Sequence, residues 1–434
     1  MSGTPRLNDK RALLVALHYP PDGGSSGVLR PLKFSKYLPG HGWTPHVLTA
    51  RDSLFKVRDE GLLAEVPPEG AVHRAAAWDS ARHLAIRGRY LGLTAVPDRF
   101  ITWLPMGIAT GLRVIRREGI QVIWSTSPPP TAHLIAAALH ARTRLPWVAD
   151  FRDPWIEEGI YPAPGSLRLR VERWMERRVL RGADRITVTT PLLKEEIAGR
   201  HPWLDPDRIV VIYNGYDEAD FARVDVVPRV DRLEIAHAGF VNGEFRDPLP
   251  LLRAVADLIR EGTIPRDRIL VTFLGGGSYL ESEEYRTGVA PLGLDGVVEI
   301  ERRVPHRDAL QRLHAAGALL VLQASDDTRG LIPAKAFEYL RSTRPILSLT
   351  PDGATSSLIK GMPGCFVVDP ADRDALRNAV RDLYETWNLA PGAPTRPRPV
   401  QQFERRRLTG ELAQLFESLT KSPRPATTGQ HESP

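Results

Sequence analysis

The chain has 434 residues, and because single domains rarely exceed roughly 250–300 residues, we expect two domains. The formal net charge is +6, mostly from scattered arginines, which suits a phosphate-rich ligand or an anionic membrane surface. The chain lacks the concentrated Lys/Arg block typical of nucleic-acid binding, and a lone cysteine, Cys365, excludes an intrachain disulfide and a CxxC metal or redox site.

The beginning of the chain, "MSGTPRLNDKRALLVALHYPP", carries an apolar run shorter than the h-region of a signal peptide, and Pro20-Pro21 ends that run. No stretch approaches the roughly 18 consecutive apolar residues of a membrane span. We therefore expect a cytoplasmic protein, either soluble or in peripheral contact with the inner face of an anionic membrane.

The first half of the chain alternates short apolar runs with longer helical patterns. Strands are expected at Ala12–Leu17, Pro45–Thr49, Val122–Ser125, Trp147–Phe151, Ile186–Thr189 and Ile209–Ile212. Helices are expected near Val28–Leu38, Thr131–Thr143, Leu167–Arg181 and Pro191–Gly199. Strands that are apolar throughout and separated by helices predict a parallel, doubly wound α/β sheet.

The same pattern restarts in the second half. Strands are expected at Leu233–Ala238, Ile269–Leu274, Val297–Ile300, Ala318–Leu322 and Pro345–Leu349, and helices near Leu249–Arg260, Arg307–Ala315, Ala334–Arg341 and Asp372–Trp387. A polar segment at 217–231 separates the halves, and the proline-rich stretch "PGAPTRPRP" precedes a last helix near Gln402–Leu419. We expect domains at 1–217 and 231–390, a C-terminal helix at 400–419 and a disordered tail at 420–434.

Two loops that follow strands of the first half carry candidate site residues, because ligands bind at the carboxyl ends of parallel strands. The loop "HYPPDGGSSGVLR" contains Gly23, Gly24 and Ser25 and allows the backbone to approach a ligand; the alternative is a plain tight turn. The loop "VADFRDPW" concentrates charged residues at a strand end, where an Asp–Arg pair closing the loop is the alternative. Its candidates are Asp150, Arg152 and Asp153.

Glycine-rich loops also follow the first two strands of the second half. Gly239 lies in the first of them, and Gly275 lies in "LGGGS", which follows the next strand. Arg246 precedes a helix, where it is placed to meet a diphosphate; a pair with Asp247 is equally consistent with the sequence.

The stretch "GLIPAKAFEYL" begins an apolar helix with a glycine and a proline and carries one carboxylate, Glu338. The amides at its start, at Gly330, Leu331 and Ile332, are candidates to hold phosphate. A carboxylate accepts two hydrogen bonds, and a ribose diol donates two, so this helix is suited to a nucleotide. The alternative is a helical ion pair between Glu338 and Arg341.

Taken together, the motifs "HYPPDGGSSG", "STSPPPTAHL", "PWVADFRDPW", "YNGYD", "GEFRDP" and "GLIPAKAFEYLRSTRPIL" resemble the family 4 glycosyltransferases of the GT-B fold, in a subgroup common in bacterial surface-polysaccharide pathways. The likeness spans nearly the whole chain. It implies two Rossmann-like domains facing across a cleft, with the acceptor side in the first and the nucleotide-sugar side in the second. It also implies a C-terminal helix that crosses back to the first domain.

The resemblance implies roles for particular residues. Glu338 matches the second Glu of the family's E-x7-E motif, which contacts the donor ribose, whereas Gly330 replaces the first. Arg246 matches one of two basic positions on the diphosphate, and Phe240 occupies the other. Arg152-Asp153 stands where the family often has His-Asp, which makes Asp153 the catalytic-side candidate, and the backbone of Val304 matches a contact to the base.

The expected activity is transfer of a sugar, with retention of configuration, from a nucleotide-diphosphate sugar to a hydroxyl of a glycan, a lipid-linked sugar or a secondary metabolite. The resemblance implies that the leaving phosphate deprotonates the acceptor. No cofactor is expected beyond the donor co-substrate, no metal ion and no nucleic acid. Alternatives are a nucleotide-sugar epimerase of the same fold and a non-catalytic nucleotide-sugar-binding protein; a nicotinamide dehydrogenase is disfavoured because the GxGxxG fingerprint is absent.

For the acceptor side we expect Asp153 to orient a hydroxyl and Arg152 to meet a phosphate of a lipid-linked acceptor. The arginines at positions 82, 87 and 89, close to Tyr90 and Leu91, are candidates to dock the first domain on an anionic membrane.

Overall fold

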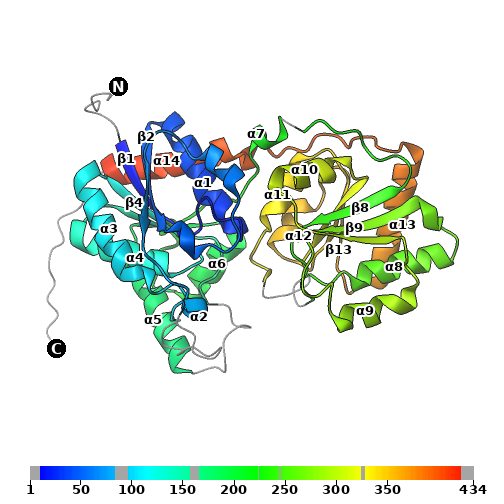
Figure 1. Cartoon of the computed structure of the whole chain (residues 1–434), viewed down its shortest axis with the longest axis horizontal. Coiled ribbons are helices and arrows are strands. Elements are labelled where there is room, and N and C mark those ends of the chain that lie inside the picture. Colours follow the sequence, from blue (N-terminus) through cyan, green and yellow to red (C-terminus); the bar gives the residue numbers. More distant parts are fainter. Residues whose placement is uncertain are drawn as a thin grey trace.

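The computed structural model describes residues 10–83, 96–156, 166–222, 224–243, 246–323 and 328–421. Two α/β domains lie side by side along the long axis of the molecule, with the short helix α7 (Glu218–Phe221) at the crossing between them (Figure 1). The expected membrane-facing positions 87 and 89–91 and most of the expected disordered tail lie outside the described residues.

The first domain is built on a seven-stranded sheet of order β3-β2-β1-β4-β5-β6-β7, in which all neighbouring strands are parallel. The strands are β1 (Lys10–Val15), β2 (Trp43–Ala50), β3 (Ala71–Ala75), β4 (Val122–Ser127), β5 (Trp147–Phe151), β6 (Arg185–Val188) and β7 (Ile209–Val211). The helices are α1 (Leu29–Tyr37), α2 (Ser80–His83), α3 (Trp103–Glu118), α4 (Thr131–Thr143), α5 (Leu167–Gly182) and α6 (Pro191–Arg200).

The second domain repeats the arrangement with a six-stranded parallel sheet of order β10-β9-β8-β11-β12-β13. Its strands are β8 (Leu233–Ala238), β9 (Ile269–Leu274), β10 (Val298–Glu301), β11 (Ala318–Leu322), β12 (Ile346–Leu349) and β13 (Cys365–Val368). Its helices are α8 (Leu249–Arg260), α9 (Glu283–Val289), α10 (His306–Ala315), α11 (Ala334–Arg341), α12 (Ala354–Ile359) and α13 (Arg373–Leu389). The expected fold class, two doubly wound parallel sheets, is confirmed.

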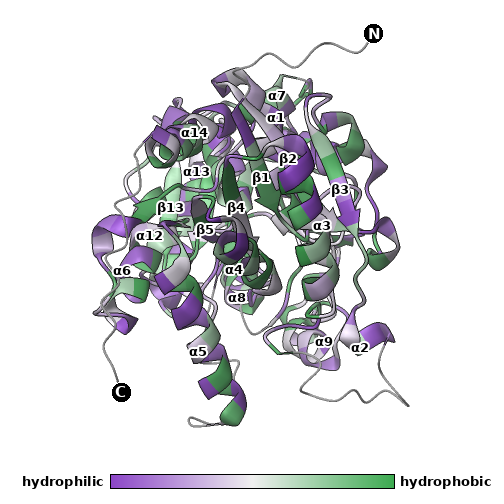
Figure 2. Cartoon of the chain, turned by 90° about the vertical axis from the view of Figure 1, so that its left-hand side faces the viewer, coloured by the Kyte–Doolittle hydropathy of each residue, from purple (hydrophilic) through white to green (hydrophobic). Residues whose placement is uncertain are grey.

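The central strands are buried on both faces, which explains their uninterrupted apolar sequences. Figure 2 shows β1 and β4 in hydrophobic colours between helices of mixed hydropathy. None of the helices in the described ranges combines the length and apolar character that a membrane span requires.

Helix α3 was not expected from the sequence because it contains glycines and a proline, which are weak helix formers. The structure supplies the reason for two of these glycines. A Cβ atom at Gly107 would lie 2.5 Å from Ile135 Cδ1, and one at Gly111 would lie 2.7 Å from Leu139 Cδ1. Glycine at these i, i+4 positions therefore lets α3 pack closely on α4.

The last helix, α14 (Arg405–Lys421), follows the second domain in sequence but packs on the first. Its residues Leu408, Leu412 and Phe416 join a buried cluster that includes Leu14 and Trp43 of the first sheet. In Figure 1 this red helix lies with the first domain, and the chain leading to it crosses between the domains. The crossing places the start of α14 beside the cleft.

Candidate active site

Loops at the carboxyl ends of both sheets enclose a cavity of about 720 Å³ between the domains. Gly23 and Ser25, which follow β1, line it from the first domain. The second domain contributes Gly239 after β8, Gly275 after β9 and Val304, together with Lys335 and Glu338 from α11. The structure thus brings the expected donor-side residues Gly239, Gly275, Val304 and Glu338 to one cavity.

Glu338 pairs with a histidine from a neighbouring helix. Its Oε1 lies 2.8 Å from Nε2 of His306, the first residue of α10. The Glu338 carboxylate raises the pKa of His306 to about 9, so the imidazole is positively charged at neutral pH. Burial opposes ionisation of Glu338, but the charged His306 outweighs it and lowers the pKa of the carboxyl. The alternative pair with Arg341 does not form, because Arg341 binds Glu218 instead.

Lys335 is a site residue that the sequence analysis missed. Its Nζ lies 3.1 Å from His237 Nε2, and His237 Nδ1 lies 2.9 Å from the Leu320 carbonyl oxygen. Because Nδ1 must donate to that carbonyl, Nε2 carries the lone pair and accepts from Lys335. Burial, with a smaller effect of Arg246, lowers the pKa of Lys335 to about 7. The available signal was its position three residues before Glu338, on the same helix face.

Arg246 supplies a second cation, at the point where two cavities meet. It lines the large cavity and a smaller one of about 320 Å³. Its Nη1 donates to the Phe240 carbonyl oxygen at 3.0 Å, and burial lowers the pKa of the guanidinium. The Phe240 side chain is 53% exposed and brings no charge. Lys335 and Arg246 add to the positive charge of a wall that also carries Arg303 and the charged His306.

The loop before α11 faces the first domain. The Gly330 carbonyl oxygen accepts from Thr190 Oγ1 at 2.5 Å, and a Cβ atom at position 330 would lie 2.8 Å from Glu196 Oε1. Leu331 and Ile332 line the smaller cavity. Gly330 therefore serves the contact between domains, while the next two residues reach the cleft.

The smaller cavity joins this loop to the loop after β5. Asp153 lines it together with Leu331 and Arg246, and burial raises the pKa of Asp153 against the opposing effect of Arg152. The structure therefore brings the expected catalytic-side carboxylate Asp153 close to the loop that begins α11.

Two of the expected acceptor-side residues have structural roles instead. Asp150 is fully buried, and its carboxylate binds Arg30 at 2.7 and 3.0 Å and accepts from Thr126 and Thr187. The prediction that Asp150 faces the acceptor is therefore wrong, because every side-chain oxygen is used inside the first domain.

The side chain of Arg152 also has a structural role within the first domain. Its guanidinium donates to the Ser127 carbonyl at 3.0 Å and to the Gly27 and Pro128 carbonyls at 2.5 Å each. These bonds tie three loops at the carboxyl edge of the first sheet together. Arg152 lines the smaller cavity but is 7% exposed, so we assign it the role of positioning loops rather than of binding an acceptor phosphate.

The loop after β1 contributes in two ways. The Gly23 carbonyl oxygen accepts from Arg303 Nη2 at 2.6 Å, which is a direct bond between the domains, and Ser25 lines both cavities. Gly24 is exposed, and its amide donates to Asp22 Oδ1 at 2.9 Å. It shapes the loop without lining either cavity.

His18 is a further residue that the sequence analysis did not single out. It lines the smaller cavity, and its Nδ1 lies 2.7 Å from Asp22 Oδ2. Since Asp22 is held by the Gly24 amide, the pair fixes the orientation of the imidazole. Its place directly after the first strand was the signal for a site residue.

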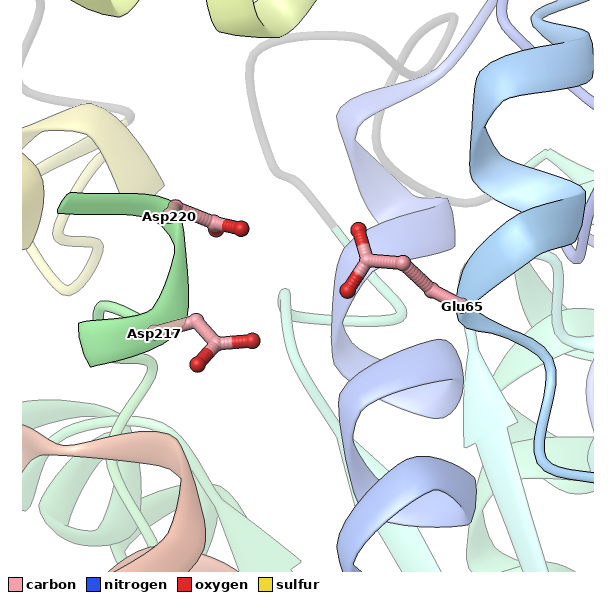
Figure 3. A group of neighbouring side chains, drawn as sticks. All are labelled: Glu65, Asp217 and Asp220. Carbon is pink, nitrogen blue, oxygen red and sulfur yellow. The ribbon is translucent and has the colours of Figure 1, made fainter. Parts of the chain in front are cut away.

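Three carboxylates outside the cavities point toward one another, namely Glu65, Asp217 and Asp220 (Figure 3). The ammonium of Lys33 lies among them, 2.7 Å from Glu65 Oε2, 2.7 Å from Asp217 Oδ2 and 3.1 Å from Asp220. Burial opposes the charge of Lys33, but the three carboxylates outweigh it and raise its pKa. The group clamps the crossing segment around α7 to the first domain, and a lysine already provides its counter-charge.

Comparison with known proteins shows what this chain is similar to. The model of the glycosyl transferase 4-like domain matches residues 7–215. A D-inositol 3-phosphate glycosyltransferase of a Nocardioides species is 29% identical over 308 residues, which cover 64% of this chain and 65% of that protein. One from Streptomyces scabiei is 29% identical over 225 residues, which cover 49% of each chain. The chain thus spans from about half to about two thirds of the length of these curated relatives.

Solved structures resemble the whole chain. The structure of Anabaena HepE in complex with UDP-glucose has a TM-score of 0.62 at 14% identity and covers 94% of this chain and 99% of its own. Sucrose-phosphate synthase from Thermosynechococcus elongatus has a TM-score of 0.60 at 16% identity, with coverage of 95% and 96%. At these identities the likeness establishes the fold. The chain therefore has the GT-B fold, and its residues 7–215 match the model of the glycosyl transferase 4-like domain.

Proposed function

We propose that the protein is a retaining glycosyltransferase that moves a sugar from a nucleotide-diphosphate sugar to a hydroxyl acceptor. One observation carries the proposal: the cavity between the domains joins the buried carboxylate of Glu338 with two cations, Lys335 and Arg246. A ribose needs an acceptor of two hydrogen bonds, and a diphosphate needs positive charge. The cavity offers both on one wall.

The nucleotide is placed by residues of the second domain. His306 occupies one side of Glu338 and keeps it ionised, so the carboxylate can accept from the ribose hydroxyls. Gly275 lies near the backbone of Gly239, because a Cβ atom there would lie 3.2 Å from the Gly239 carbonyl carbon. The base is proposed to lie against these loops and the backbone of Val304, which line the cavity.

The leaving diphosphate is stabilised where its charge develops. Lys335 and Arg246 supply positive charge, and the first turn of α11, which lines the cavity, adds the positive end of the helix dipole. Since these groups are held before the substrate arrives, little reorganisation is needed during bond cleavage. No step requires a metal ion, and we propose metal-independent turnover.

The acceptor is proposed to enter the smaller cavity. Asp153 and His18, which pairs with Asp22, line it from the first domain, opposite the loop at Leu331. Both side chains are suited to orienting a hydroxyl. The names of the curated relatives make an inositol phosphate the first acceptor to test, alongside glycan and lipid-linked acceptors.

The deciding experiment incubates the purified protein with UDP-, GDP- and TDP-sugars, with and without acceptor. Release of nucleoside diphosphate that depends on the acceptor, with NMR of the product showing the donor's anomeric configuration, would support the proposal. A new free sugar formed from donor alone would favour the epimerase. Binding of a nucleotide sugar without turnover on any acceptor would favour a binding protein, and inversion would refute the retaining mechanism.

A further inference from the structure

The guanidinium of Arg405 is buried beside the smaller cavity and has no counter-ion among the residues that the structure describes. Arg405 is the first residue of α14 and is 2% exposed. Among the residues that the structure describes, no acceptor lies within hydrogen-bond distance of its Nη1, and no carboxylate forms an ion pair with it. It lines the smaller cavity with Arg246, Asn214 and Arg30.

The backbone around Arg405 is fully held. Its amide donates to the Tyr216 carbonyl at 2.8 Å, and its carbonyl accepts from Thr409 Oγ1 at 2.7 Å. The start of α14 is therefore anchored through the main chain. The guanidinium does not help to hold the helix in place, so the anchoring of α14 does not require a positive charge at this position.

The neighbouring Arg30 provides a direct comparison. It is as buried as Arg405, yet its guanidinium binds Asp150 at 2.7 and 3.0 Å and the carbonyl oxygens of Ile212 and Tyr213 at 2.9 and 2.8 Å. The first domain thus provides Arg30 with a counter-ion and with carbonyl acceptors. Arg405 lines the same cavity without such partners among the described residues.

A buried charge without a partner destabilises the folded protein until a counter-ion binds. Burial, with repulsion from Arg30, lowers the pKa of Arg405 to about 9, which leaves the guanidinium charged at neutral pH. Glu338, Asp217 and Asp220 act on it only over longer distances. A planar guanidinium in this setting suits a bidentate oxyanion such as phosphate.

We propose that Arg405, together with Arg246, forms a subsite for a phosphate group at the floor of the smaller cavity. Two sources carry this chemistry: the diphosphate of the donor and a phosphate on the acceptor. The assignment to either source rests on the proposed function, whereas the anion subsite itself does not. Because Arg405 begins α14, the subsite also links the C-terminal helix to the ligand.

The test replaces Arg405 with methionine, which keeps the stem and removes the charge. The matched control is Arg407→Met, at an exposed position in the same turn of α14. Affinities for UDP, for uridine and for inorganic phosphate in the presence of saturating UDP are measured by calorimetry, and the melting temperature is measured without ligand. A structural arginine and a ligand-binding arginine give opposite results in the last measurement.

We expect Arg405→Met to melt at the wild-type temperature or above it, because an uncompensated buried charge is removed. At least about tenfold weaker UDP binding with unchanged uridine binding assigns the subsite to the donor diphosphate. If UDP binding is unchanged and phosphate binding is weakened by the same factor of about ten or more, the subsite is assigned to the phosphate of the acceptor. The control should match the wild type.

Unchanged affinity for both UDP and phosphate would overturn the proposal, as would a lower melting temperature with intact affinities. If Arg405→Met does not fold, Arg405→Lys keeps the charge and loses the forked geometry, and its affinities decide in the same way. A wild-type protein that binds phosphate but not UDP would refute the proposed function and leave the anion subsite standing.

Discussion

Binding of a nucleoside diphosphate should weaken as the pH rises from 7 to 9, because Lys335 loses its proton in this range. Burial lowers the pKa of this amine to about 7, so it is charged below that value and neutral above it. A pKa of 7 leaves about half of the amines charged at pH 7 and about 1% at pH 9, which allows up to about a 50-fold loss of affinity. The affinity falls with rising pH because the negatively charged diphosphate binds better to the protonated, positively charged amine.

The assay is calorimetric titration with UDP at several pH values, in pairs of buffers with different ionisation enthalpies. Wild-type protein should take up a proton on binding between pH 7 and 9. Lys335→Met should bind UDP more weakly at pH 6, by about 10- to 100-fold, and should lose most of the pH dependence. Uridine, which carries no phosphate, should bind both proteins equally, and Lys360→Met, at an exposed position of the same domain, should behave as wild type.

Other titrating groups face the same wall. His306 has a pKa of about 9 and supports Glu338, so its deprotonation adds a smaller loss above pH 8 that persists in Lys335→Met. Arg246 stays charged throughout, and His237 stays neutral because burial holds its pKa well below the ordinary value. A wild-type affinity that is flat from pH 6 to 9, or an equal pH dependence in Lys335→Met, would refute the reasoning.

Four further outcomes are expected. Glu338→Ala should weaken binding of both UDP and uridine by about 10- to 100-fold without unfolding the protein, since it removes a charged acceptor from the ribose; equal affinities would contradict this. Turnover should be unchanged in a chelator, and a complete loss restored by Mg²⁺ or Mn²⁺ would count against metal independence. Asp153→Asn should raise the acceptor KM by roughly tenfold and leave the donor KM unchanged; the reverse pattern in steady-state kinetics would move this loop to the donor side. Lys33→Met should lower the free energy of unfolding, measured in urea, by about 1.5–3 kcal/mol, because Asp220 loses its ion-pair partner while Lys36 still pairs with Glu65 and Asp217; a change within error would show that the cluster is not a clamp.

Local sequence patterns were sufficient to predict the central strands and helices of both domains. β5 at Trp147–Phe151, α4 at Thr131–Thr143 and α11 at Ala334–Arg341 have the bounds that the sequence predicts. Buried strands such as β5 can be recognised in the sequence because strands covered on both faces are apolar throughout. The edge strands β3 and β13 lack that pattern, since several of their residues remain partly exposed.

The sequence by itself also determined which loops carry the site, because polar and glycine-rich segments at strand ends meet at one edge of a parallel sheet. Only the tertiary structure decided which side chains of those loops are free. Asp150 and Arg152 looked alike in the sequence as candidates, yet both are used up inside the first domain, whereas Lys335 was hidden in a helix pattern. Their roles depend on partners such as Arg30, which lies 120 residues from Asp150. Arg405 likewise became a candidate binding residue only in the tertiary structure, because α14 crosses back to the first domain and buries the side chain beside the cleft. Packing between distant segments produces this arrangement, and no local sequence period predicts it.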